Sequence, residues 1–226
     1  MHIARSSSFH RDLGDGLVLR WSTAEDTERI ATLHALVHRE QADAPPNAHY
    51  LRQIRGLMNG DYPLMGPQDF GIIEDKNREG NPVVASTCLW KHTWAYEGIP
   101  FGVGRPEAVA TLPEYRHRGL IRALFEMVHA RSEAEGDLVQ AITGLVYFYR
   151  QFGYEYALEL EDWRATPLAL IPKAQDDGPE PYIFREATAR DIPLIEELYK
   201  RPPSSQTFGH TSNGSMRSKS GNSILN

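Results

Sequence analysis

A strand, a turn and a helix in direct succession, at residues 107–135, constrain this chain more than any other stretch. The segment reads EAVATLPEYRHRGLIRALFEMVHARSEAE. In its second half, apolar residues recur at the i, i+3, i+4 and i+7 spacing of a helix with one buried face, namely Ile121, Leu124, Phe125 and Val128. Gly119 and flanking arginines precede this helix. Because the first turn of a helix has unpaired N–H groups and the positive end of the dipole, the stretch predicts a site for a small anion.

Charge and composition restrict what this anion can be. The chain of 226 residues carries a formal net charge of −6. Nucleic acids and anionic membranes attract basic proteins, so neither is expected as the main partner. No apolar run approaches the roughly 18 residues of a membrane-spanning helix. A lone cysteine, Cys88, excludes a disulfide framework. These features favour a globular, cytoplasmic protein in which the basic loop is a local feature.

Strand and helix patterns extend on both sides of this unit. Residues 1–16 have no apolar core and are expected to form a flexible leader. Strand patterns occupy residues 17–21, 70–74, 83–96, 99–112, 138–142, 154–160 and 162–169. Helix patterns occupy residues 27–40, 50–58 and 146–152, and Ser22 with Glu25 has capping-box spacing. Residues 17–170 are therefore expected to form one α/β (α+β) domain.

The opening strand–cap–helix pattern returns near the end of the chain, after a linker-like segment at residues 171–181. The residues Arg20, Thr23, Ala24, Asp26, Ile30 and Leu33 recur as Arg185, Thr188, Ala189, Asp191, Ile195 and Leu198. Residues 182–201 therefore predict the start of a truncated second copy. From residue 202 to residue 226 the chain is polar and rich in serine and glycine, so this tail is expected to be disordered.

The loop before the long helix resembles the acyl-CoA signature of the Gcn5-related N-acetyltransferase (GNAT) superfamily. That signature is Arg/Gln-x-x-Gly-x-Gly/Ala after a strand and a hydrophobic-Pro step, and here Leu112-Pro113 precedes RHRGLI at residues 116–121. Ile121 departs from the family's Gly or Ala, but its side chain can point into the core while its N–H faces the pyrophosphate. A second segment, YRQFGY at residues 149–154, resembles the family's Tyr-x-x-x-Gly-Phe/Tyr motif.

The resemblance implies a GNAT fold, which is a mixed, mostly antiparallel central sheet flanked by helices, with acetyl-CoA as cosubstrate. It implies that the loop wraps the CoA pyrophosphate and that the preceding strand borders the acetyl and pantetheine arm. The cofactor-binding residues expected are Val109, Ala110, Thr111, Arg116, His117, Arg118, Gly119, Leu120, Ile121 and Arg122. Tyr149 is expected as the general acid, because a phenol with a pKa of about 10 stays protonated at neutral pH and can donate to a leaving thiolate.

The expected activity is direct transfer of acetyl to a primary amine of a small molecule or protein. The base that deprotonates this amine is left open among Glu40, Glu74 and Glu107. His34 and His38 have a metal-capable spacing without an accompanying carboxylate, so no metal is expected. The repeat makes the chain resemble the enhanced-intracellular-survival type of acetyltransferase, in which a second domain helps close the acceptor pocket. The alternative is an inactive acyl-CoA-binding module that lacks a complete acceptor pocket, and a homo-oligomer is left open.

Overall fold

A computed structural model describes residues 9–145, 147–157, 185–200 and 209–210. The chain separates into two compact units, Met1–Glu155 with Phe208–Gly214, and Tyr156–Thr207 with Ser215–Asn226. The strands are β1 (His10–Gly14), β2 (Leu17–Trp21), β3 (Phe70–Asp75), β4 (Val83–Tyr96), β5 (Ile99–Thr111), β6 (Val139–Gln140) and β7 (Gly209–His210). The α-helices are α1 (Thr27–Val37), α2 (Ala48–Met58), α3 (Leu120–Glu135) and α4 (Ile192–Lys200). Short 3-10 helices occupy Ala24–Asp26, Pro113–Tyr115, Tyr149–Phe152 (η3) and Ala189–Asp191.

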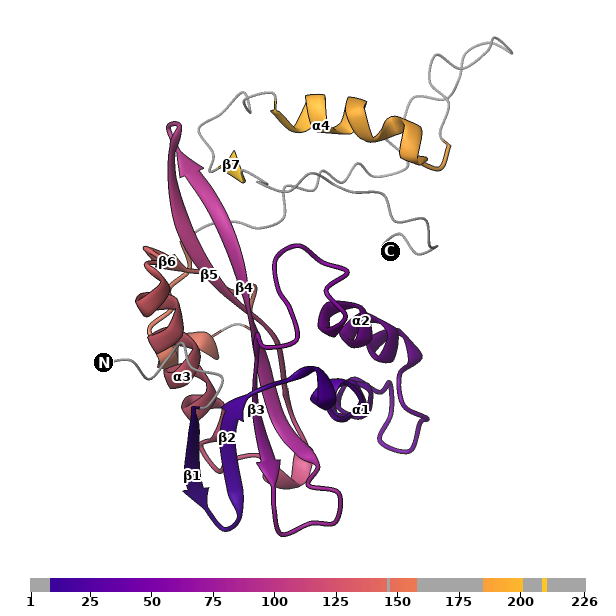
Figure 1. Ribbon diagram of the computed structural model, residues 1–226, viewed down its shortest axis with the longest axis vertical. Coiled ribbons are helices and arrows are strands. Elements are labelled where there is room, and N and C mark those ends of the chain that lie inside the picture. The colour runs from indigo at the N-terminus through magenta and orange to yellow at the C-terminus, as the bar shows by residue number, and fades with distance from the viewer. Residues whose placement is uncertain (1–8, 146, 158–184, 201–208, 211–226) are drawn as a thin grey trace, which may run out of the picture. The chain divides into compact units, whose positions relative to one another are not determined.

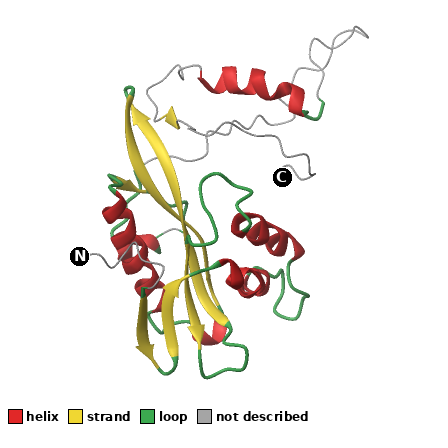
Figure 2. Ribbon diagram, viewed as in Figure 1, coloured by secondary structure: helices red, strands yellow, loops and turns green. Residues whose placement is uncertain are grey.

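One sheet organises the first unit. Its strands lie in sequence order from β1 to β6, and β7 pairs with β4. All pairs from β1 to β5 are antiparallel, whereas β5 and β6 are parallel and are connected through α3. A parallel pair needs a long crossover connection of this kind. The mixed, mostly antiparallel sheet with its flanking helices confirms the expected GNAT-type α/β architecture, as Figure 1 and Figure 2 show.

The two faces of the sheet are buried by different helices, with α1 and α2 on one face and α3 on the other (Figure 1). Successive side chains of a strand point to opposite faces. Ile72 of β3 accordingly belongs to the core cluster of α1 and α2, and the adjacent Ile73 belongs to the cluster of α3. Both isoleucines are 0% exposed. β3 and β4 are thus covered on both faces, which gives β5 and α3 a rigid support.

The capping box lies one residue later than the sequence predicted, at the 3-10 helix Ala24–Asp26 that leads into α1. Ser22 is buried, and its hydroxyl donates to the Pro67 carbonyl over 2.6 Å instead of capping. Thr23 is the N-cap residue, and Asp26 completes its capping box. The prediction of Ser22 and Glu25 as the capping pair is therefore wrong. Both pairs have the required spacing, and burial of Ser22 decides between them.

The predicted leader is also wrong in part, because β1 occupies residues 10–14. This strand pairs with β2, with His10 opposite Arg20. Its turn is supported by Asp12, whose side chain accepts a hydrogen bond of 2.8 Å from the Gly14 N–H. An edge strand of mostly polar residues has only weak periodicity, so the sequence pattern missed it.

Four further boundaries differ from the predictions. The helix predicted to reach residue 40 ends at Val37, and the strand predicted at residues 138–142 is only Val139–Gln140. The helix predicted at residues 146–152 is η3, and residues 154–157 form no strand. Residues 1–8, the strand expected at residues 162–169, the linker at residues 171–181 and the tail, apart from β7, lie outside the described residues.

The described part of the second unit repeats the local geometry that precedes α1. Arg185 pairs with Asp191 over 2.5 Å, as Arg20 pairs with Asp26 over 2.7 Å. Thr188 forms a capping box with Asp191, matching the first copy. The repeat therefore extends from residue types to hydrogen bonds, and its assignment as the start of a truncated second domain stays a prediction.

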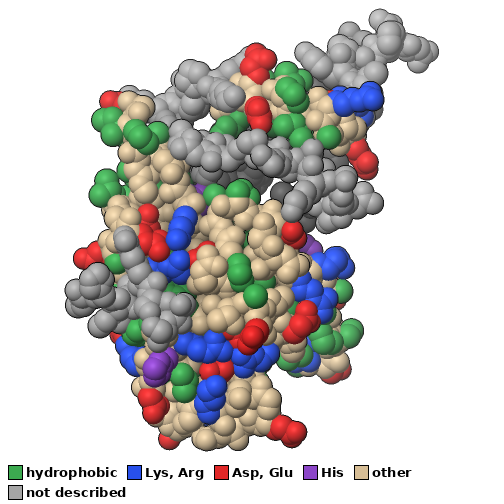
Figure 3. All heavy atoms as spheres, in the orientation of Figure 1, with side chains coloured by type: hydrophobic (Ala, Val, Ile, Leu, Met, Phe, Trp, Pro, Cys, Tyr) green, Lys and Arg blue, Asp and Glu red, His purple; other side chains and the backbone are tan. Residues whose placement is uncertain are grey.

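The described surface carries both signs of charge. On the face drawn in Figure 3, Lys and Arg side chains lie beside Asp and Glu side chains. Glu74, which is 2% exposed, pairs with Arg20, Arg29 and Lys76 over 2.7–3.0 Å.

Within the described residues, none of the helices has the length and apolar composition of a membrane span.

Candidate functional site

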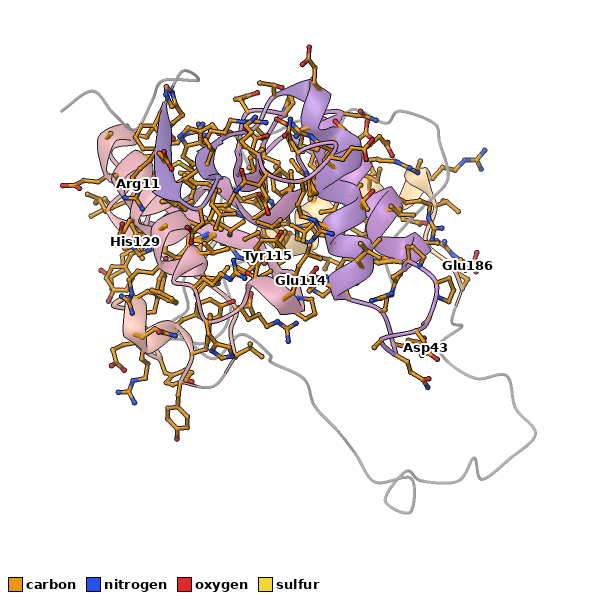
Figure 4. The ribbon with its side chains drawn as sticks, turned by 90° about the horizontal axis from the view of Figure 1, so that it is seen from below. Arg11, Asp43, Glu114, Tyr115, His129 and Glu186 are labelled. Atoms are coloured by element: carbon orange, nitrogen blue, oxygen red, sulfur yellow. The ribbon has the colours of Figure 1, made fainter. Side chains whose placement is uncertain are left out.

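The predicted strand–turn–helix unit is formed by β5, the 3-10 turn at Pro113–Tyr115, and α3. Tyr115 anchors the turn: its side chain is buried, and its hydroxyl donates to Asp75 Oδ2 over 2.6 Å. The guanidinium of Arg118 lies 5.0 Å from the centre of the same ring. Figure 4 labels Glu114 and Tyr115 in this connection, and His129 farther along α3. Sequence reasoning missed Tyr115, although an aromatic residue in a polar loop was an available signal.

The start of α3 is open to an anion. Its N-cap residue is Gly119, which has the left-handed φ of 73° and no capping side chain. A Cβ placed on Gly119 would meet nothing within 4 Å, so the space beside the first turn is free. The N–H groups of Leu120, Ile121 and Arg122 belong to this first turn and lack intrahelical partners. An uncapped helix start of this kind fits a phosphate or pyrophosphate group.

The side chains of the loop divide between solvent and core. Arg116, His117, Arg118 and Gly119 are exposed, whereas Leu120 is buried in the α3 core cluster. Ile121 packs partly against the same cluster. Its side chain therefore points toward the core, as expected for a bulky residue at this position of the loop.

Arg122 links the start of α3 to the segment that carries Tyr149. Its guanidinium lies 5.2 Å from the centre of the Phe152 ring, and its Nη2 is 3.5 Å from Gln151 Oε1. The structure therefore brings the binding loop and the Tyr149 segment together. In the sequence they are distant, since 26 residues separate Gly119 of the loop from residue 146, where the short helix that carries Tyr149 was predicted to start.

β5 has a β-bulge at the residues that the family resemblance assigns to the acetyl and pantetheine arm of acetyl-CoA. The register with β4 shifts so that Ala108 and Val109 together oppose Thr87. Ala108 has a φ of 50°, which is unusual for a residue with a side chain. The Glu107 carbonyl accepts a hydrogen bond of 2.9 Å from the Thr87 hydroxyl. A bulge re-aims backbone groups away from the strand ladder, as an oxyanion site at a thioester carbonyl requires.

The two residues after the bulge differ in their surroundings. Ala110 is buried in the core cluster of α1 and α2, so only its backbone can contact a ligand. Thr111 Oγ1 is buried and has no hydrogen-bond partner among the described residues. A buried hydroxyl without a partner is costly unless a ligand or water satisfies it. Thr111 therefore fits the pantetheine arm of acetyl-CoA, whose amides can hydrogen-bond.

Tyr149 lies at the start of η3 in an aromatic environment. Its ring centre is 5.8 Å from that of Phe125 and 5.0 Å from that of Phe148. The backbone of Gly144 packs directly on the same ring, where a Cβ would overlap the Tyr149 side chain. Burial raises the pKa of Tyr149, and the negative charge of Glu107 raises it further. The phenol therefore keeps its proton at neutral pH.

The three candidate bases have different surroundings in the fold. Glu74 is buried, which alone would raise its pKa, but hydrogen bonds from Arg20 and other cations lower this pKa to about 2. Glu40 is exposed beyond the end of α1. Glu107 directly precedes the bulge, and its charge acts on Tyr149. Of the three, Glu107 is the carboxylate whose charge acts on the predicted acid.

The surroundings of His34, His38 and Cys88 indicate a structural role for all three residues. His34 is 0% exposed, its Nε2 is hydrogen-bonded to Ser86 Oγ over 2.9 Å, and burial lowers its pKa to about 3. His38 Nδ1 is 3.0 Å from the His34 carbonyl. Burial raises the pKa of the Cys88 thiol, so this residue is a poor nucleophile. In the part of the chain that the structure describes, no three His, Cys, Asp or Glu residues form a metal-binding group.

The sequence of residues 19–157 matches the family model of the acetyltransferase (GNAT) domain. The chain belongs to the GNAT family of acetyltransferases. GNAT enzymes use acetyl-CoA as cosubstrate, so the family supports acyltransferase chemistry for this protein. No curated protein matches the chain. The finer resemblance to the enhanced-intracellular-survival type stays a prediction.

Several solved structures are similar to this chain. A possible acetyltransferase from Clostridium difficile 630 has a TM-score of 0.50 at 13% identity, covering 67% of this chain and 99% of that one. An acetyltransferase from Trypanosoma brucei has a TM-score of 0.49 at 18% identity, covering 66% of this chain and 99% of that one. A GCN5-related N-acetyltransferase from Kribbella flavida has a TM-score of 0.46 at 22% identity, covering 62% of this chain and 33% of that one. At these identities the likeness concerns the fold alone.

Proposed function

We propose that this GNAT protein transfers an acetyl group from acetyl-CoA directly to a primary amine of a small molecule or protein. The observation that supports this most is the placement of Tyr149, a half-buried phenol with a raised pKa: Gly144 packs on its ring, and the preceding Thr143 is hydrogen-bonded to Glu107, the residue before the bulge of β5. An acid, a carboxylate and re-aimed backbone groups are the parts that aminolysis of a thioester requires.

The cosubstrate would be held by residues on both sides of the strand-to-helix turn. The first-turn N–H groups of α3 and the side chains of the basic loop would bind the pyrophosphate, namely Arg116, His117, Arg118, Gly119, Leu120, Ile121 and Arg122. Val109, Ala110 and Thr111 would border the acetyl and pantetheine arm. When bound, acetyl-CoA supplies the acetyl group as an activated thioester.

Each proton in the proposed reaction has a named residue. Glu107, directly or through a water molecule, takes a proton from the acceptor amine, whose nitrogen then bonds to the acetyl carbon. The carbon–sulfur bond breaks, and Tyr149 donates its phenolic proton to the departing sulfur. The surplus proton on the acylated nitrogen then passes to the tyrosinate and restores the phenol, and Glu107 releases its proton to solvent. Arg105 holds Glu107 in place through an ion pair of 2.7 Å, and the Thr143 hydroxyl donates to the same carboxylate over 3.4 Å.

A thiol-release assay tests this proposal. We expect acetyl-CoA to release thiol with primary amines and not with matched alcohols, and mass spectrometry to find one acetyl group on the amine. Tyr149→Phe should lower kcat by about 100-fold, since it removes the general acid, and leave the KM for acetyl-CoA within about twofold. Unchanged turnover in this variant would remove Tyr149 as the acid. Binding of acetyl-CoA in a thermal-shift assay, with no thiol release for any amine, would favour an inactive binding module.

A further inference from the structure

We infer that His129, Tyr154 and Gln140 form a hydrogen-bonded clamp that positions Tyr149 and the adjoining end of β6. The inference rests on the proposed function, because it gives these three residues a role in placing the proposed acid. None of the three belongs to the predicted binding loop.

One hydroxyl joins three separate elements. Tyr154 Oη lies 2.8 Å from Nε2 of His129 on α3 and 3.3 Å from Oε1 of Gln140 on β6. A tyrosine hydroxyl has a single proton. Because Gln140 Oε1 can only accept, Tyr154 donates to it and accepts a hydrogen bond from the Nε2–H of His129. The chain of donors therefore has one direction, from α3 through Tyr154 to β6.

β6 needs this connection because its pairing with the sheet is short. Only Val139 and Gln140 pair with β5, opposite Val103 and Gly104. A two-residue strand at the edge of a sheet has few ladder hydrogen bonds to hold it. The side chain of Gln140, held by Tyr154, gives this strand an attachment that does not depend on the ladder.

The same clamp reaches Tyr149 through backbone and ring contacts. Gly153, with a φ of 93°, ends η3, and the Tyr154 N–H then donates to the Tyr149 carbonyl over 3.4 Å. The rings of Tyr149 and Tyr154 both lie on Phe125, with centre separations of 5.8 and 6.0 Å. His129 contacts Phe125 at 5.5 Å. A shift of Tyr154 therefore disturbs both the backbone and the packing of Tyr149.

Few other charges act on this cluster. Glu107 faces it from β5, Arg122 from α3, and Arg150 is paired with Glu155 over 2.8 Å beside η3. Burial lowers the pKa of His129, which favours the neutral imidazole. Because the Tyr154 hydroxyl donates to Gln140, the tautomer that fits the clamp has its hydrogen on Nε2. Protonation would add a hydrogen on Nδ1 and leave the Nε2–H in place.

Two substitutions at His129 separate a hydrogen bond from simple packing. His129→Phe retains a ring and removes the donor, whereas His129→Gln retains an N–H donor near the position of Nε2. We expect His129→Phe to lower kcat about tenfold with the KM for acetyl-CoA unchanged within about twofold. His129→Gln should restore kcat to within about threefold of the wild-type value.

A second measurement decides the inference without turnover. Ultraviolet titration of tyrosinate, taken as the difference between each protein and its Tyr149→Phe counterpart, gives the pKa of Tyr149 alone. In His129→Phe, looser packing admits water, so this pKa should fall toward the ordinary value of about 10. His129→Gln should keep the wild-type value. Circular dichroism melts establish that each variant is folded at the titration temperature.

Two results would overturn the clamp: an unchanged Tyr149 titration in His129→Phe, or equal impairment in His129→Phe and His129→Gln. Absence of thiol release by the wild type would instead reject the proposed activity, and the titration would still decide whether His129 positions Tyr149. The two failures are therefore distinguishable.

Discussion

Tyr149 is held by residues from several parts of the chain, and one of them is a glycine. Gly144 packs against its ring, Phe125 of α3 stacks on it, and Glu107 of β5 acts on its charge. Each neighbour acts differently: Gly144 sets the position of the ring, Phe125 excludes water, and Glu107 favours the protonated phenol. The environment of the proposed acid is therefore a product of tertiary packing.

Gly144→Ala should displace the Tyr149 ring, because a Cβ at residue 144 would lie 2.7 Å from Tyr149 Cε2. We expect kcat for thiol release to fall at least about tenfold, because small misplacements of a catalytic group are costly, while acetyl-CoA binding stays within about twofold. Gly56→Ala on α2 is the matched control, since its Cβ would meet atoms at 3.4–3.5 Å, which is ordinary contact. Equal kcat in Gly144→Ala and the control would contradict the assigned position of Tyr149.

His34 predicts a pH dependence of stability. Its folded pKa of about 3 lies below the ordinary value of 6.5, so the unfolded chain binds its proton first as the pH falls. The free energy of unfolding should therefore decrease below pH 6.5, by about 2 kcal/mol down to pH 4.5. Urea unfolding at a series of pH values measures this decrease. His34→Gln, which keeps a donor toward Ser86, should flatten the slope in this interval, and an unchanged slope would exclude His34 as its source.

Sequence reasoning at the residue scale succeeded where a local motif carried the signal. Gly119 was found because a glycine and the start of a helix pattern are adjacent in the chain. Tyr115 and Arg105 were missed because their roles depend on partners, Asp75 and Glu107, that only the fold identifies. The functional roles of the predicted binding residues and of Tyr149 stay predictions.

At the scale of elements, the strand–cap–helix unit occurs twice with the same hydrogen bonds and with different burial. In the first copy Ile30 and Leu33 are at most 1% exposed, whereas their counterparts Ile195 and Leu198 in α4 are each 51% exposed. The capping geometry is thus independent of the core that covers the helix. A local sequence signal was sufficient to predict it, apart from the one-residue shift at Ser22.

The two copies provide a matched pair of variants. Asp26→Asn removes a buried carboxylate that Arg20 and Arg29 share with Glu74, and Glu74 remains as their partner, so we expect a loss of about 2 kcal/mol in the free energy of unfolding. Asp191→Asn removes the equivalent group at an exposed site and should leave the main unfolding transition unchanged. Chemical denaturation of both variants makes the comparison, and equal losses would show that the second copy is integral to the folding of the first unit.

At the scale of the whole molecule, the strand and helix patterns predicted an α/β domain, and the resemblance to the GNAT superfamily implied a mixed sheet flanked by helices. The long elements β4, β5 and α3 closely match their predictions, because each has a long periodic pattern. β1 and β6 do not, since an edge strand and a two-residue strand are fixed by their neighbours. The sequence left Glu40, Glu74 and Glu107 equivalent, and only the arrangement of the sheet distinguishes them.

The most direct test of the account is calorimetric binding of CoA and of pantetheine, which lacks the pyrophosphate and the nucleotide. If the uncapped first turn of α3 and its flanking arginines hold the pyrophosphate, CoA should bind at least about 100-fold more tightly than pantetheine, because charge-assisted hydrogen bonds are lost. Inorganic pyrophosphate should compete with CoA, and added salt should weaken CoA binding. Equal binding of CoA and pantetheine, without competition by pyrophosphate, would contradict the assignment of this helix start as the cosubstrate site.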